Sequence, residues 1–260
     1  MYVFDNSAPQ ARARLAALAE VHDAGTIRHL LARGVADGWT CLEIGGGGGT
    51  ITRWLSDRVG ARGSVLTTDI DTRFLETVGL PNVEVRRHDI LTDPLPDATF
   101  DLAYARAVLE HLPDPDLALD RMVMALKPGG WLVVEDVEAT SSGLVGEPID
   151  RFSKTLLAMR RVIAGAGADL GLGLTLGHRL RARGLMHVGH EGRVQLCRGN
   201  SAAARLARLN FEQLRVPILA TGVTAAEFEA DLSRLEDEDF EWRSPTLWTA
   251  WGQRPVGDSA

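Results

Sequence analysis

The stretch TCLEIGGGGGT, residues 40–50, decides the fold of this chain. Its first five residues form an apolar run that predicts a strand, and ITRWLSDRV at 51–59 has the apolar spacing of an amphipathic helix. Glycines in a strand-to-helix turn let a ligand approach the backbone, and the first turn of a helix offers unpaired N–H groups. The segment therefore predicts a ligand-binding loop at the carboxyl end of a strand.

Beyond this loop, short apolar strands alternate with amphipathic helices. Such alternation predicts a parallel sheet with helices on both of its faces. Strands are expected at 40–44, 64–69, 82–89, 100–105 and 131–138, and helices at 51–59, 72–78 and 115–126.

Two helices are expected before the first strand. Residues 7–20 have Ser7 and Gln10 at the spacing of a capping box, and Leu15 and Leu18 share one face of the helix. A second helix over 26–33 should stop at Gly34.

The last third of the chain is less regular. A glycine-rich break at 164–177 precedes a strand expected near 186–197, and helices are expected at 201–215 and 224–236. A final strand is expected at 246–254. No internal repeat and no long linker are visible, so a single domain is expected.

Composition narrows the class of protein. The 260 residues are 45% hydrophobic with a formal net charge of −7, which argues against wholesale disorder and against a nucleic-acid partner. No apolar run approaches the roughly 20 residues that span a bilayer. The N-terminus lacks the pattern of a secretory signal, and Cys41 and Cys197 lie too far apart to suggest a disulfide framework or a metal site. We expect a cytoplasmic protein without a metal or membrane partner. The excess of arginine over lysine indicates a GC-rich bacterial source.

The carboxylate of Asp69, at the end of the second expected strand, is placed to accept hydrogen bonds from a ribose diol. A dinucleotide is disfavoured, because the third glycine of its Gly-x-Gly-x-x-Gly fingerprint is replaced in each register by Thr50, Ile51 or Thr52. The pattern that fits is Glu-x-Gly-x-Gly-x-Gly, at Glu43, Gly45, Gly47 and Gly49.

Four blocks in order across about 39–138 resemble those of class I S-adenosylmethionine-dependent methyltransferases. More loosely, Tyr2 with Arg14-Leu15 resembles the lid helix of small-molecule members related to quinone and natural-product methyltransferases. Beyond the glycine loop, the four blocks are Asp69-Ile70-Asp71, then His88-Asp89-Ile90, then Phe100-Asp101 with Arg106 and His111-Leu112-Pro113, and last Leu126-Lys127-Pro128-Gly129-Gly130.

This resemblance implies a Rossmann-like, doubly wound α/β fold. Its mostly parallel seven-stranded sheet would have an antiparallel last strand, with N-terminal lid helices over 1–36 and a cofactor-binding core over 37–139. Substrate-side helices and an insertion would follow over 140–245, and 246–254 would be the last strand. S-adenosylmethionine is the implied cofactor. The implied cofactor-binding residues are Glu43, Gly45, Gly47, Gly49, Asp69, Ile70, His88, Asp89, Ile90 and Arg106.

Some of these assignments have alternatives. Asp69 could instead cap a helix, Asp89 could be a solvated loop acid, and Arg106 could hold the cofactor's carboxylate, hold an acidic substrate or pair with a neighbouring acid. His111 is expected to be either a general base or a structural hydrogen-bonding residue. Tyr2 and Arg14 are expected in the lid, facing the substrate.

The implied function is methyl transfer to a small-molecule acceptor, a secondary metabolite, at oxygen or carbon, by a monomer or homodimer. The alternative is a relative that binds S-adenosylmethionine without methylating, of a cyclase-like or regulatory kind. A nucleotide-dependent oxidoreductase is a further alternative, which the glycine pattern disfavours.

Overall fold

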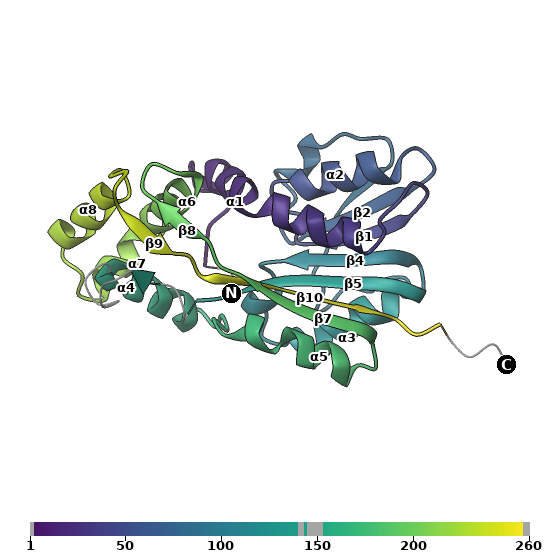
Figure 1. Ribbon diagram of the computed structural model, residues 1–260. Helices are drawn as coiled ribbons and strands as arrows, with labels where there is room; N and C mark the ends of the chain where they lie inside the picture. The colour runs from purple at the N-terminus through teal and green to yellow at the C-terminus, as the bar shows by residue number, and fades with distance from the viewer. Residues whose placement is uncertain (1–2, 140–142, 145–152, 257–260) are drawn as a thin grey trace.

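The computed structural model describes residues 3–139, 143–144 and 153–256, and its centre is a seven-stranded sheet (Figure 1). The strand order is β3-β2-β1-β4-β5-β10-β7, and β10 runs antiparallel to both of its neighbours. The Rossmann-like fold class with a reversed last strand is confirmed. The strands are β1 Thr40–Ile44, β2 Ser64–Asp69, β3 Val83–Arg87, β4 Phe100–Arg106, β5 Leu126–Glu138, β7 Met186–Arg193 and β10 Thr246–Gln253.

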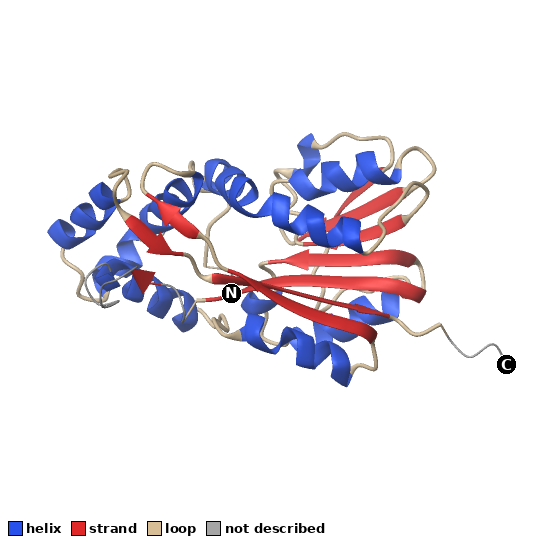
Figure 2. Ribbon diagram, in the orientation of Figure 1, coloured by secondary structure: helices blue, strands red, loops and turns tan. Residues whose placement is uncertain are grey.

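Helices cover both faces of this sheet, with α1 and α2 on one side and α3 and α5 on the other (Figure 2). The alternation of side chains along β1 explains the two layers, since Cys41 packs in the core beneath α1 and α2, and Leu42 packs in the core against α3 and α5. The helices of this part are α1 Ala11–Ala32, α2 Thr50–Val59, α3 Pro115–Ala125 and α5 Leu176–Ala182, with 3₁₀ turns η1 Leu75–Thr77, η2 Leu109–His111 and η3 Leu172–Thr175.

The N-terminal region differs from the sequence prediction. One continuous helix, α1, replaces the two expected helices, and its N-cap is Gln10, which makes no side-chain cap. The expected capping box is wrong because the Ser7 hydroxyl and backbone N–H both donate to Asp5 instead. The helix ends as expected, with Gly34 at a φ of +84° directly after it.

The helix expected at 72–78 is also wrong, since only the single turn η1 forms there. Asp71 accepts the Arg73 backbone N–H and makes a local turn that competes with a helix start. Gly79, at a φ of +57°, then ends the segment before further turns can form.

A helical module lies beyond one end of the sheet, at the left of Figure 1. It has its own hydrophobic cluster, which contains Phe211, Phe228 and Trp242. The expected strand at 186–197 proves to be two strands in different sheets, β7 and β8, because the chain leaves the main sheet after Arg193. The module comprises α4 Ser153–Gly165, α6 Ala202–Gln213, α7 Arg215–Ala220, α8 Ala225–Arg234 and the small sheet β6 Gly143–Leu144, β9 Glu241–Arg243 and β8 Leu196–Arg198.

Two local predictions for the module can be compared with the structure. The capping box of Thr224 and Glu227 is confirmed at the start of α8, with both reciprocal hydrogen bonds present. The helix expected at 201–215 ends earlier, at Gln213, and α7 follows after Leu214. Within the described part of the chain, none of the helices is both long and apolar enough to cross a membrane.

Candidate functional site

A cavity of about 630 Å³ opens at the carboxyl ends of β1, β2 and β4 and continues toward the helical module. Ligands of open α/β sheets bind at this edge, where the order of the strands reverses. In this sheet the reversal falls between β1 and β4, beside the glycine loop.

The glycine loop forms one wall of the cavity. Gly47 has a φ of +52°, and a Cβ built on it would find no atom closer than Leu15 Cδ2, at 3.5 Å. The space that a side chain of this residue would occupy is therefore available to a ligand. Gly49 has a different role, because it is the N-cap of α2 at a φ of +75° and a Cβ there would lie 2.8 Å from Val78. Gly45 lines the cavity, but Gly49 is absent from its lining.

Glu43 lies at the base of the glycine loop and is 2% exposed. The Thr52 hydroxyl (2.5 Å) and the Thr67 hydroxyl (3.0 Å) both donate to its Oε2. Burial raises the pKa of Glu43 to about 7, although these two hydrogen bonds favour the charged form. Glu43 therefore presents a carboxyl group to the cavity that a cationic ligand group would ionise.

Asp69 lies at the end of β2 and also lines the cavity. Its Oδ2 accepts the Gly47 N–H and its Oδ1 accepts the Asp71 N–H, both at 3.0 Å. Burial raises the pKa of Asp69 and outweighs these hydrogen bonds. Each oxygen keeps lone-pair capacity for a diol, so the geometry fits the ribose-binding role expected for this residue.

His88, Asp89, Ile70 and Ile90 come together at the same end of the cavity. The His88 ring is 4% exposed, and neither of its nitrogens has a hydrogen-bond partner among the described residues. Ile70 is 55% exposed at the rim and offers an apolar surface, whereas Ile90 is buried. Buried polar groups are normally paired, so the orphaned His88 nitrogens fit a ligand that carries donors or acceptors, such as adenine.

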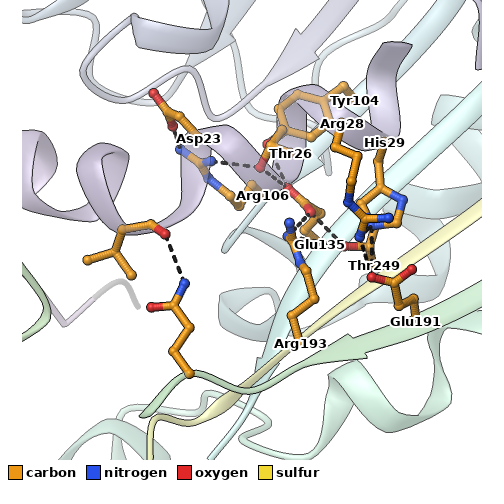
Figure 3. A network of polar contacts seen from close by, with 12 residues as sticks. Asp23, Thr26, Arg28, His29, Tyr104, Arg106, Glu135, Glu191, Arg193 and Thr249 are labelled. Atoms are coloured by element: carbon orange, nitrogen blue, oxygen red, sulfur yellow. Dashed lines mark hydrogen bonds and ion pairs between the residues drawn. The ribbon is translucent and has the colours of Figure 1, made fainter. Parts of the chain in front are cut away.

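Arg106 lines the cavity but points its guanidinium at α1 (Figure 3). It donates to Asp23 Oδ1 at 2.8 Å and to Thr26 Oγ1 at 2.9 Å. Of the roles considered for Arg106, pairing with a neighbouring acid is the one present here. Thr26 donates in turn to the fully buried Glu135.

Glu135 joins α1 to three strands of the sheet. It also accepts hydrogen bonds from Tyr104 (3.1 Å), Arg193 (2.7 Å) and Thr249 (2.6 Å), which lie on β4, β7 and β10 (Figure 3). Asp23, Thr26 and Glu135 therefore hold α1 against the sheet beside the cavity.

His111 lies in η2, after β4, and lines the cavity. Its Nε2 is 3.2 Å from Glu110 Oε1, and its side chain is 13% exposed. Glu110 Oε2 accepts the Val137 backbone N–H at 3.2 Å. Burial, together with the Glu110 carboxylate, raises the pKa of the adjacent Asp136. Glu110 is thus held in place and can orient the His111 ring.

The cavity-facing side of α1 includes Leu15, Leu18 and His22, at the spacing of one helical face. Arg14 also lines the cavity, with its guanidinium 4.3 Å from the centre of the Phe4 ring. Tyr2 lies outside the described residues. His22 was not predicted as a cavity residue, although its spacing from Leu15 and Leu18 on the helix was a usable signal. Burial, with the charges of Arg106 and Arg193, lowers the pKa of His22 to about 3, so its ring is neutral.

The part of the cavity made by the helical module was also not predicted from the sequence. This part is mainly apolar, and we call it the apolar chamber. Its lining residues are Leu156, Met159, Arg160, Ile163, Cys197, Leu206, Asn210, Phe211 and Trp242, with Phe4 and Asn6 from the N-terminal segment.

Comparison with known proteins agrees with this geometry. Residues 42–134 match the family model described as a methyltransferase domain. The chain is 33% identical over 140 residues to the ubiquinone/menaquinone biosynthesis C-methyltransferase UbiE of Saccharophagus degradans, which covers 50% of this chain and 56% of that protein. The chain thus spans little more than half the length of this curated relative.

Solved structures share the fold. The YcgJ protein of Bacillus subtilis superposes with a TM-score of 0.59 at 14% identity, over 91% of this chain and all of that one. Phosphoethanolamine N-methyltransferase 2 of Haemonchus contortus, in complex with S-adenosyl-L-methionine, has a TM-score of 0.54 at 16% identity, over 94% of this chain and 52% of that one. Residues 42–134 are therefore similar to a methyltransferase domain, and the described chain shares the fold of these solved structures.

Proposed function

We propose that this protein transfers the methyl group of S-adenosylmethionine to a carbon or oxygen atom of a small-molecule acceptor. One observation carries the proposal: a single cavity joins the glycine loop and Asp69 to the apolar chamber. A cofactor on the loop and an acceptor in the chamber would share one enclosed space. That arrangement suits a displacement in which the protein aligns the reactants and excludes water.

Several residues are suited to hold the cofactor. Gly47 leaves room for it, Asp69 can accept from its ribose, His88 can pair with its base, and Glu43 can compensate its ammonium group. When bound, S-adenosylmethionine supplies an activated methyl group on a sulfonium. The chain's own residues need only position the acceptor atom and hold its proton.

His111 is our candidate for the proton-holding role. A hydroxyl or an acidic carbon loses a proton when it is methylated, and a neutral imidazole is suited to receive it. The contact with Glu110 would orient the ring and stabilise its charged form.

The acceptor is further proposed to be a secondary metabolite. Similarity to a C-methyltransferase of quinone biosynthesis favours carbon as the acceptor atom, and a quinone-like precursor is a reasonable member of a first substrate panel.

Calorimetry and mass spectrometry test the proposal together. We expect S-adenosylmethionine and S-adenosylhomocysteine to bind with one site per chain, and at least one hydroxylated aromatic or quinol acceptor to gain a single methyl group. Cofactor binding without a methylated product across a broad panel would favour the non-methylating alternative. Failure of both cofactors to bind would overturn the proposal.

A further inference from the structure

We propose that the apolar chamber binds an uncharged, predominantly apolar acceptor that carries a hydroxyl group, and that the Asn210 carboxamide hydrogen-bonds this hydroxyl. The inference rests on the proposed function and deepens it, because it names the chemical class of the acceptor and a residue that selects it.

The first support is that the core of the helical module is open to the cavity. Phe4, Ile163, Cys197, Phe211 and Trp242 belong to one hydrophobic cluster, and all five also line the cavity. Apolar side chains of the module's core therefore form part of the cavity wall. Apolar surface of this kind is stabilised when a ligand removes it from water.

The second support is a pair of carboxamides without partners. Asn6 Oδ1 and Asn210 Oδ1 are both buried, and neither has a hydrogen-bond partner among the described residues. Gln213, one turn beyond Asn210 on α6, donates to the carbonyl of Asp5, so the segment that carries Asn6 lies beside α6. Buried carboxamide oxygens without donors are unusual, and a ligand hydroxyl would satisfy one.

The third support concerns charge. Arg14 faces the Phe4 ring, and the charge of Glu138 acts on Arg160. Burial is the main influence on the pKa of Arg160 and lowers it. This part of the cavity is therefore poorly hydrated. The two arginines already have groups that interact with them, and the other residues that line the chamber carry no charge. A neutral acceptor therefore fits better than a phosphorylated one.

Three naphthalene probes test the inference by calorimetry on the full chain saturated with S-adenosylhomocysteine. They are 1-naphthol, 1-methoxynaphthalene, which lacks the hydroxyl donor, and 1-naphthyl phosphate, which is charged. We expect 1-naphthol to bind about 5-fold more tightly than 1-methoxynaphthalene, the usual value of one hydrogen bond. We expect 1-naphthyl phosphate to bind more weakly than either.

Two variants of similar volume make the test specific to Asn210. Asn210→Leu should abolish the preference for 1-naphthol and leave 1-methoxynaphthalene binding unchanged. Asn210→Asp keeps an acceptor oxygen and should retain the preference. Thermal melts of both variants check that they fold. If Asn210→Leu weakens the binding of 1-naphthol and of 1-methoxynaphthalene equally, Asn210 only shapes the chamber and the inference is wrong.

Other outcomes would also overturn the inference. Tighter binding of 1-naphthyl phosphate would identify an anion site at Arg14 and Arg160 instead. Absence of probe binding to protein that binds S-adenosylhomocysteine would reject the chamber while leaving the proposed cofactor site intact. If S-adenosylhomocysteine itself fails to bind, the proposed function fails, and titration of the probes into the protein alone still tests the chamber.

Discussion

At the scale of single residues, the proposed cofactor site depends on a backbone that approaches a carboxylate. The Gly47 N–H donates to Asp69, so the loop and the end of β2 are already joined before any ligand binds. The open space above Gly47 and the remaining lone pairs of Asp69 then face the same part of the cavity.

This geometry predicts the effect of two substitutions on cofactor affinity. Asp69→Ala should weaken S-adenosylmethionine binding by about 1–3 kcal/mol, the usual cost of stranding a buried hydrogen-bond partner. Gly47→Val should abolish binding, and it should also lower the melting temperature, since a β-branched residue is strained at a φ of +52°. Asp71→Ala is the matched control, because Asp71 does not line the cavity. Unchanged calorimetric affinity in the first two variants would disprove the assignment of this loop.

The role of His111 can be decided by turnover measurements. His111→Ala should reduce kcat by roughly 100-fold or more, as expected for a positioned base, with little change in cofactor affinity. His111→Gln preserves a hydrogen bond but accepts no proton at neutral pH, so it should be as slow as the alanine variant. The kcat of Glu110→Gln should lie between the kcat of these two variants and that of the parent chain. A fast His111→Gln variant would show that the ring only orients the loop or the acceptor.

Glu43 predicts a pH dependence of stability. Its pKa is about 7 in the folded chain and 4.5 as the ordinary value, so between these pH values the folded state keeps a proton that the unfolded state has lost. Stability from this group is therefore lost as pH rises through that window and is constant above it. Glu43→Gln should remove this loss. Relative to the parent, it should gain about 2–3 kcal/mol between pH 5 and pH 8. Urea unfolding without cofactor measures this, and parallel pH curves would contradict the prediction.

At the scale of elements, α1 is a wall of the cavity that is tied to the sheet. Asp23 bonds to Arg106, and Thr26 bonds to both Arg106 and Glu135. The part of the helix just before Asp23 carries Leu15, Leu18 and His22, which line the cavity. The expectation of an N-terminal helix over the ligand thus gains a specific attachment point.

Breaking the attachment of α1 to the sheet should lower the stability of the protein. Asp23→Ala leaves the Arg106 guanidinium, whose side chain is 11% exposed, without its acid. We expect a loss of about 2 kcal/mol in the free energy of unfolding, together with a higher KM for the acceptor. Glu20→Ala on the same helix removes an exposed ion pair with Arg205 and should cost under about 1 kcal/mol. Equal losses in the two variants, from denaturant unfolding, would show that the Asp23 pair is not special.

At the scale of the whole molecule, the two halves of the cavity belong to different hydrophobic clusters. The half proposed to hold the cofactor lies against the sheet, and the chamber half lies in the helical module. Damage to the module's cluster should therefore affect acceptor binding more than cofactor binding.

Phe228 tests this separation, because it is fully buried in the module, packs 6.5 Å from the Phe211 ring and does not line the cavity. Phe228→Ala should cost about 3–5 kcal/mol of stability by leaving a void. It should raise the acceptor's KM several-fold while leaving S-adenosylmethionine affinity within about 2-fold. Parallel losses in both affinities, measured below the melting transition, would show that the two halves respond as one.

The sequence by itself determined the parts of this protein that depend on neighbours along the chain. The apolar run before the glycine loop predicted β1 with its observed bounds, and the strand that ends at Asp69 was equally clear. The capping box of α8 was visible because its hydrogen bonds join residues three apart. Periodicity and turn chemistry are local properties, so they can be read directly.

Tertiary structure alone decided the contacts between distant segments. The pairing of Arg106 with Asp23 joins residues 83 positions apart, and the chamber brings Phe4 and Asn6 against α6. The competing roles of Arg106, the continuity of α1 and the division of 186–197 between two sheets had no local signature. Each depends on which surfaces meet when the chain becomes compact, and long-range burial overrides local preference wherever the two compete.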